Sequence, residues 1–141
     1  MIAYFETSAL VKLLVAEPET PDVEVLWDEA AGLVTSRLTY PECRVALAGA
    51  ARAGRLTRSG LRAARTELER RWRQFVRVEI EERVARAAGD LAEHHALRAY
   101  DAVHLASGLE AGRGGHILFV SFDQTLLGAA RRSGLAVAPT G

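Results

Sequence analysis

The chain has 141 residues, 49% of them hydrophobic, and its 18 basic side chains balance 18 acidic ones. This length supports one domain with a substantial core, and the balanced charge indicates no class of partner for the molecule as a whole. The single cysteine excludes an internal disulfide, and no apolar run reaches the ~20 residues that span a bilayer. No basic segment precedes the first apolar residues, so we expect no signal peptide and a soluble, cytoplasmic protein with no membrane partner.

Short apolar runs alternate with amphipathic segments along the whole chain. In chain order the pattern first predicts a strand over residues 2–5, a helix capped by Thr7 or Ser8, a helix from Thr20 to Gly32, and a strand over 33–35. The middle of the chain predicts a helix from Ser36 or Thr39 to about Arg52, a helix over 57–74 and a strand over 75–80. The rest predicts helices over 81–96 and 99–111, a strand over 117–121, a helix over 124–132 and a strand over 135–138. This alternation predicts a single α/β domain over residues 1–141, with a largely parallel central sheet flanked by helices.

Four carboxylates fall at informative places in this pattern. Glu6 directly follows the first strand, and Asp123 follows ILFVS by one residue, so both lie at one sheet edge if these strands are parallel. Glu42 and Asp101 lie inside apolar helical patterns, and both are predicted to point toward packed structure. Ligands of parallel sheets bind beyond the carboxyl ends of the strands, which makes this edge the candidate site.

Each acid also has a local structural explanation. Glu42 fits the third position of a capping box that begins at Thr39, in the sequence TYPE. Asp123 and Asp101 are each suited to cap a helix, and Glu6 is suited to the positive end of the first helix.

Taken together, however, four acids at one edge of the sheet repel one another and require cations. Oxygen ligands suit Mg²⁺ or Mn²⁺ rather than zinc, which favours phosphodiester chemistry with a metal-activated water.

Four segments resemble the PIN-domain nucleases, particularly the VapC toxins of VapBC toxin–antitoxin pairs. They are FETSALVKLLVAE, TYPECRVAL, AYDAVHLA and VSFDQTLLGAA, so the resemblance spans nearly the whole chain. It implies a PIN-like fold and a magnesium-dependent endoribonuclease that forms a homodimer, acts on RNA and is silenced by a VapB-type antitoxin.

The resemblance also assigns roles to individual residues. It implies that Glu6 and Asp101 are the main magnesium ligands and that Glu42 and Asp123 complete the acidic pocket. The resemblance also implies that Thr7 and Ser121 support this pocket through hydrogen bonds. Mn²⁺ is the expected substitute metal.

Glu6 departs from the resemblance, because PIN-domain nucleases carry aspartate at this position. Glutamate is longer by one methylene, and magnesium demands near-ideal octahedral geometry. Three alternative explanations of Glu6 stay open from the sequence: natural variation, loss of activity, or an introduced inactivating substitution. The alternative function is therefore a degenerate PIN fold that binds RNA or an antitoxin without cutting. A magnesium phosphatase is disfavoured, because no D-x-D motif follows the first strand.

Basic residues are concentrated in one part of the sequence. Residues 51–77 contain nine arginines and only two acids, whereas residues 1–50 contain three basic and eight acidic side chains. Arg58, Arg62 and Arg65 lie along one side of the predicted helix and form a candidate track for the RNA backbone. The competing interpretation is a solvated face with i,i+4 ion pairs, which we favour for the arginines later in this helix.

Overall fold

The computed structural model describes residues 1–140 and has the predicted α/β architecture. Five parallel strands form one sheet in the order β3-β2-β1-β4-β5. The strands are β1 (Ile2–Phe5), β2 (Gly32–Ser36), β3 (Val76–Val78), β4 (Ile117–Val120) and β5 (Ala136–Ala138). The helices are α1 (Thr7–Val11), α2 (Thr20–Glu29), α3 (Thr39–Arg52), α4 (Arg58–Trp72), α5 (Glu82–His95), α6 (Ala99–Ala111) and α7 (Gln124–Arg132), with a short 3-10 helix, η1 (Gly112–Gly114), after α6.

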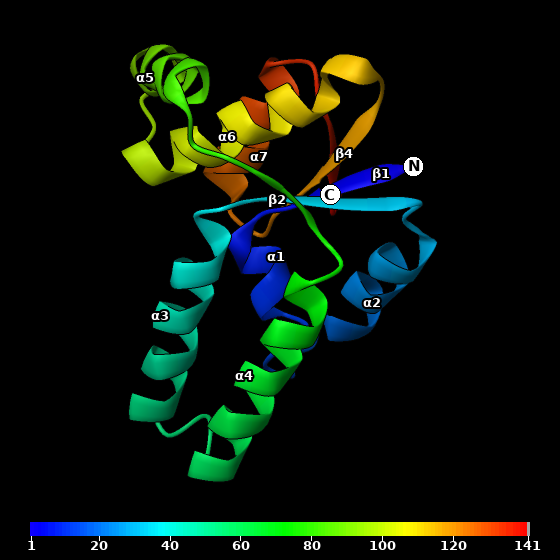
Figure 1. Ribbon diagram of the computed structural model, residues 1–141, viewed down its shortest axis with the longest axis vertical. Helices are drawn as coiled ribbons and strands as arrows, with labels where there is room; N and C mark the ends of the chain where they lie inside the picture. The colour runs from blue at the N-terminus through cyan, green and yellow to red at the C-terminus, as the bar shows by residue number, and fades with distance from the viewer. Residues whose placement is uncertain (141) are drawn as a thin grey trace.

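Helices cover both faces of the sheet, which gives three layers. In Figure 1, α1 to α4 lie on one side of the strands and α5 to α7 on the other. Strand β1 shows why both faces need cover, because successive side chains point to opposite faces. Ala3 and Phe5 belong to the core under α1 to α4, whereas Tyr4 belongs to the core under α6 and α7.

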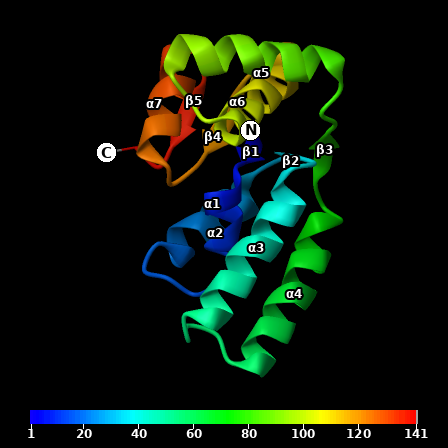
Figure 2. The same ribbon diagram turned by 90° about the vertical axis from the view of Figure 1, so that its left-hand side faces the viewer.

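Helices α3 and α4 pack against each other and extend together away from the sheet (Figure 2). Thr57 begins α4 as the sequence predicts, since its hydroxyl accepts a hydrogen bond from the N–H of Gly60 at 3.0 Å. Leu68 and Trp72 bury the apolar side of α4 against the first core. Among residues 1–140, no helix has both the length and the apolar character needed to cross a membrane.

On the opposite layer, α6 lies unusually close to the sheet. Gly108 makes this approach possible, because a Cβ atom at this position would lie 2.8 Å from the ring of Phe119 in β4. Helix α6 also packs against α5 and β2. Since the first turn of α6 carries Asp101, the depth at which α6 sits determines where this carboxylate meets the edge of the sheet.

Candidate active site

The strand order places an opening at the carboxyl ends of β1 and β4. These strands are neighbours, with Phe5 opposite Val120, and the chain connections run outward from them in opposite directions. The N–H of Glu6 donates to the carbonyl of Val120 at 3.0 Å, so the residues that follow both strands are held side by side. In open parallel sheets, a crevice for ligands forms at this kind of switch in strand order.

A cleft of about 650 Å³ occupies this position, and all four predicted carboxylates line it. Each comes from a different part of the fold. Glu6 follows β1, Glu42 lies in the first turn of α3, Asp101 lies in the first turn of α6, and Asp123 follows β4. The two helix layers and two strand ends therefore deliver four acids to one opening.

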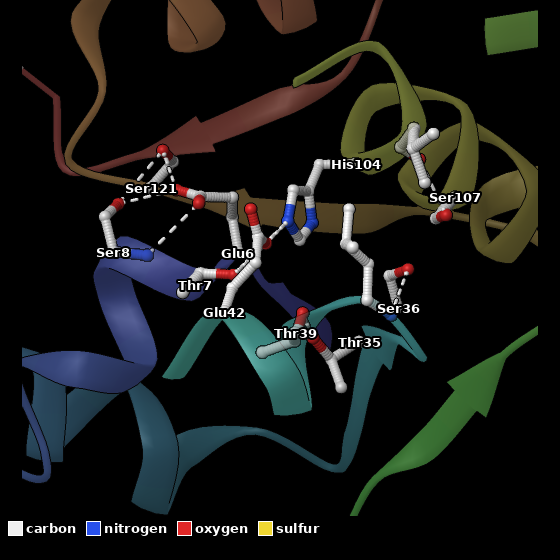
Figure 3. Close-up of polar contacts among 12 residues, drawn as sticks. Glu6, Thr7, Ser8, Thr35, Ser36, Thr39, Glu42, His104, Ser107 and Ser121 are labelled. Carbon is white, nitrogen blue, oxygen red and sulfur yellow. Dashed lines mark hydrogen bonds and ion pairs between the residues drawn. The ribbon is translucent and has the colours of Figure 1, made fainter. Parts of the chain in front are cut away.

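Glu6 is buried, and its carboxylate is held by two serines (Figure 3). Its Oε1 accepts from the hydroxyls of Ser8 and Ser121, each at 2.6 Å, and its Oε2 accepts from the N–H of Ser8 at 3.1 Å. Glu6 is thus the N-cap of α1, so the prediction of Thr7 or Ser8 as the cap is wrong. Glu6 follows the short strand β1 and has an extended backbone conformation just before α1. This is the conformation that N-cap residues adopt.

Glu42 contacts one residue of α1, Thr7, and one residue of α6, His104. Its Oε1 accepts from the hydroxyl of Thr7 at 2.6 Å and lies 2.5 Å from Nε2 of His104 (Figure 3). Burial alone raises the pKa of Glu42, but the hydrogen bond and charge of His104, with the hydroxyl of Thr7, lower this pKa below its usual value. The predicted capping box is wrong, because Thr39 pairs with Thr35 instead, at 2.8 Å between their hydroxyl oxygens.

Asp101 is the least compensated acid of the cleft. Burial raises the pKa of Asp101 to about 6, and the charges of Asp123 and Glu6 add to this effect. Asp101 does not cap its helix, because it is the third residue of α6 and Arg98 occupies the N-cap. A carboxyl group that is half-buried among other acids attracts a cation, since a cation favours its charged form.

Asp123 combines two of the roles considered from sequence. It lines the cleft, and its Oδ1 accepts from the N–H of Leu126 at 3.0 Å as the N-cap of α7. The N–H of Asp123 in turn donates to the hydroxyl of Ser121 at 3.1 Å. Capping and membership of the acidic cleft are therefore compatible at this residue.

Tyr4 and His104 support the cleft, although neither is among the site residues predicted from the sequence. Both side chains are fully buried, and Nδ1 of His104 lies 2.8 Å from the hydroxyl oxygen of Tyr4. Burial raises the pKa of Tyr4 well above its usual value, and the charge of Glu6 adds to this, so the phenol stays protonated. Two features of the sequence indicate a role for these residues. His104 lies one turn after Asp101, and the hydroxyl of a tyrosine in a buried strand requires a hydrogen-bond partner.

The basic residues of the cleft are not those of the predicted track. Lys12 and Arg55 line the cleft, and Glu17 lies between them, paired with Lys12 and 3.9 Å from Arg55. The track residues are all exposed on α4 and outside the cleft lining: Arg58, Arg62 and Arg65. Later in α4, Arg70 is exposed and pairs with Glu67, as expected for a solvated face. The same prediction is wrong for Arg71, which is buried and pairs with both Glu67 and Glu24 of α2.

The donor set of the cleft fits a hard divalent cation. Within residues 1–140, no group of three or more His, Cys, Asp or Glu side chains is arranged around one metal position. Magnesium does not require such a group, because it keeps several waters and commonly binds through one or two carboxylates. The cleft offers oxygen ligands only, and burial, together with the charges of Asp123 and Glu6, raises the pKa of Asp101 to about 6.

A PIN domain model matches residues 3–132, so the chain belongs to the PIN-domain family. Two curated relatives are Ribonuclease VapC45 from Mycobacterium tuberculosis strain CDC 1551 / Oshkosh and Ribonuclease VapC49 from strain ATCC 25618 / H37Rv. Each is 44% identical over 138 residues, which cover 98% of this chain and 95% of the relative. The crystal structure of PAE2754 from Pyrobaculum aerophilum is similar in fold, with a TM-score of 0.71 and 22% identity over 97% of this chain and 92% of that one.

Proposed function

We propose that this protein is a metal-dependent endoribonuclease and the toxin of a VapBC-type pair. The observation that carries the proposal is the meeting of four carboxylates in one cleft, where the pKa of Asp101 is raised to about 6. The relatives named Ribonuclease VapC45 and VapC49 support RNA as the substrate, since they are 44% identical to almost the whole chain. By the same likeness, we propose a VapB-type antitoxin as partner and a homodimer as the assembly.

In this proposal Asp101 and Glu6 hold Mg²⁺, or Mn²⁺ in its place, and Glu42 and Asp123 complete the acidic site. When bound, the cation supplies a nucleophilic water at neutral pH and stabilises charge on the phosphate and the leaving oxygen. Ser121 and Ser8 hold the carboxylate of Glu6 through hydrogen bonds.

The cations of the cleft have a separate part in the proposal. Lys12 and Arg55 lie on the cleft wall, where the RNA backbone must approach four acids. Glu17 lies against both cations and offsets part of their charge. The exposed arginines of α4, outside the cleft lining, are further cations available to the RNA backbone. We therefore retain Arg58, Arg62 and Arg65 as proposed RNA-binding residues.

One observation favours a second candidate function, a PIN fold that binds RNA or an antitoxin without cutting. Both carboxylate oxygens of Glu6 already accept hydrogen bonds from the adjacent serines. A glutamate held in this way is less available as a ligand than an open carboxylate.

A nuclease assay separates the two functions. Purified protein is incubated with single-stranded RNA across a magnesium titration, in parallel with EDTA and with the variant Asp101→Asn. We expect magnesium-dependent cleavage by the natural chain, none in EDTA, and a loss of at least ~100-fold in Asp101→Asn, on the scale of lost metal ligation. RNA binding without cleavage at any magnesium concentration would establish the binding-only function instead.

A further inference from the structure

We propose that His104 is a positioning residue, which turns the carboxylate of Glu42 so that Oε2 faces the ligand in the cleft. The inference rests on the proposed function, because it concerns the metal site of the same cleft. It assigns a role to a fully buried side chain that does not itself line the cleft.

Both ring nitrogens of His104 have a specific partner. Nε2 lies 2.5 Å from Oε1 of Glu42, and Nδ1 lies 2.8 Å from the hydroxyl of Tyr4. A carboxylate can only accept a hydrogen bond, so Nε2 carries the hydrogen in this pair. The second hydrogen bond, between Nδ1 and the hydroxyl of Tyr4, fixes the plane of the imidazole.

The consequence appears at the two oxygens of Glu42. Oε1 accepts from both His104 and Thr7, whereas within residues 1–140 no hydrogen bond engages Oε2. The last torsion of a glutamate is broad and rotates freely when nothing restrains it. Two donors on one oxygen stop this rotation and leave the other oxygen for a metal or for a water that it binds.

The position of His104 in the fold also favours this role. His104 lies three residues after Asp101 on α6, so both residues face the same side of the helix. One helix therefore provides a carboxylate of the cleft and the donor that orients a second carboxylate on α3. Figure 3 shows the contact between His104 and Glu42. Tyr4 links this pair to β1, the strand that Glu6 follows, so one chain of hydrogen bonds joins the three layers.

The test measures magnesium affinity by calorimetry, without RNA. His104→Leu removes the donor, and we expect it to lower the affinity by about 10–100-fold, the usual effect of losing a partner that orients a ligand. His104→Gln keeps an N–H donor and should recover part of the loss, whereas Tyr4→Phe should lower the affinity by a smaller factor. Leu105→Ala is the control for disturbing the core at α6, because Leu105 is equally buried on the same helix and does not line the cleft.

A double-mutant cycle separates positioning from a general structural effect. In a Glu42→Gln background, His104→Leu should have little further effect on magnesium affinity, since the oriented carboxylate is already gone. An equal loss in both backgrounds, or wild-type affinity in His104→Leu, contradicts the inference. If His104→Leu fails to fold by circular dichroism, His104→Gln and Tyr4→Phe are each measured in the two backgrounds with the same criterion.

The outcome is distinguishable from failure of the proposed function. Coupled magnesium binding in a protein that cuts no RNA contradicts the ribonuclease proposal and supports the positioning role. Conversely, magnesium-dependent cleavage with no coupling between His104 and Glu42 supports the ribonuclease proposal and contradicts the positioning role.

Discussion

Glu6 shows how one side chain serves both the fold and the cleft. It caps α1 through Ser8, accepts from Ser121 after β4, and lines the cleft. An aspartate in its place would draw the carboxylate back by one methylene, and the resemblance to PIN-domain nucleases implies aspartate at this position. The length of this residue is therefore the feature of the cleft most open to direct experiment.

The variant Glu6→Asp should bind magnesium more tightly and cut RNA faster, by about 10–100-fold, because the shorter ligand permits the octahedral geometry that magnesium prefers. The measurement is a magnesium titration of both proteins with one RNA. Glu17→Asp is the control, since it shortens another glutamate of the same cleft outside the four acids. Unchanged magnesium affinity and unchanged cleavage rate in Glu6→Asp would show that this account of Glu6 is wrong.

Asp101 should weaken the fold while it serves the site. Its pKa in the folded chain, about 6, lies above the ordinary value of 3.8, so the folded state disfavours the charged form. This cost is fully present above pH 6 and disappears as the pH falls below about 4, where both states are protonated. Asp101 is partly solvated, so the effect is smaller than the shift alone suggests.

Asp101→Asn should therefore raise the midpoint of thermal unfolding in EDTA at pH 7.5, by at least ~2 °C for a chain of this size. The gain should shrink as the pH is lowered from 6 to 4. Calorimetric scans of both proteins over this pH range make the measurement. A gain that stays constant across the range, or a loss at neutral pH, would show that repulsion at Asp101 is not its source.

At the scale of elements, the periodicity of the sequence predicted the order and type of every strand and α-helix, but not the short 3-10 helix η1. Burial explains the helical pattern of α4, whose apolar residues Ala64, Leu68 and Trp72 are buried. It does not explain β3, where Val76 is exposed although the sequence alternates. Caps were harder to predict, because a cap depends on which nearby group competes for the same N–H. Thr39 is suited to cap α3 from sequence, yet its hydroxyl is engaged by Thr35 across the buried end of β2.

The pairing of Tyr4 and Glu42 with His104 could not be predicted from the sequence, for a similar reason. Tyr4 and His104 are 100 residues apart, and Glu42 and His104 are 62 apart. Hydrogen bonds of this kind depend on how α6 and α3 are placed relative to the sheet, and no local pattern encodes that placement. The carboxylates themselves were identifiable, because each is an acid at a strand end or on an apolar helix.

The seating of α6 on the sheet gives a prediction about stability. Gly108→Ala should destabilise the fold, because the added Cβ meets the buried ring of Phe119, and overpacking of this kind costs about 1–3 kcal/mol. Gly89→Ala is the matched control in α5, where nothing lies within 4 Å, and it should stabilise by about 0.5–1 kcal/mol. Urea unfolding of both variants provides the comparison. A stabilising Gly108→Ala would contradict the close approach of α6 to β4.

The exposed face of α4 gives a prediction about RNA. Replacing Arg58, Arg62 and Arg65 with glutamine should weaken binding and flatten its salt dependence, by about 0.7 in log–log slope for each lost phosphate contact. Arg70→Gln is the control on the same helix, because Arg70 already pairs with Glu67. Fluorescence anisotropy across a salt series provides the slopes. Identical slopes in the triple variant and the natural chain would assign these arginines to a solvated face.

At the scale of the whole molecule, the three-layer fold brings acids from distant parts of a nearly neutral chain into one cleft. Their joint charge, rather than the net charge, determines what the cleft can bind. Our central claim is that water activated at the acidic site attacks the RNA phosphate. This claim differs from cleavage by the neighbouring 2′-hydroxyl, which requires no carboxylate-held metal.

Analysis of the product ends tests this claim most directly. The natural chain is incubated with magnesium and a single-stranded RNA, and then with the same RNA carrying a 2′-deoxy sugar at the mapped cleavage position. Attack by water predicts 5′-phosphate and 3′-hydroxyl ends, and it predicts that the deoxy substrate is still cut. Products with 2′,3′-cyclic phosphates, together with complete resistance of the deoxy substrate, would contradict the account.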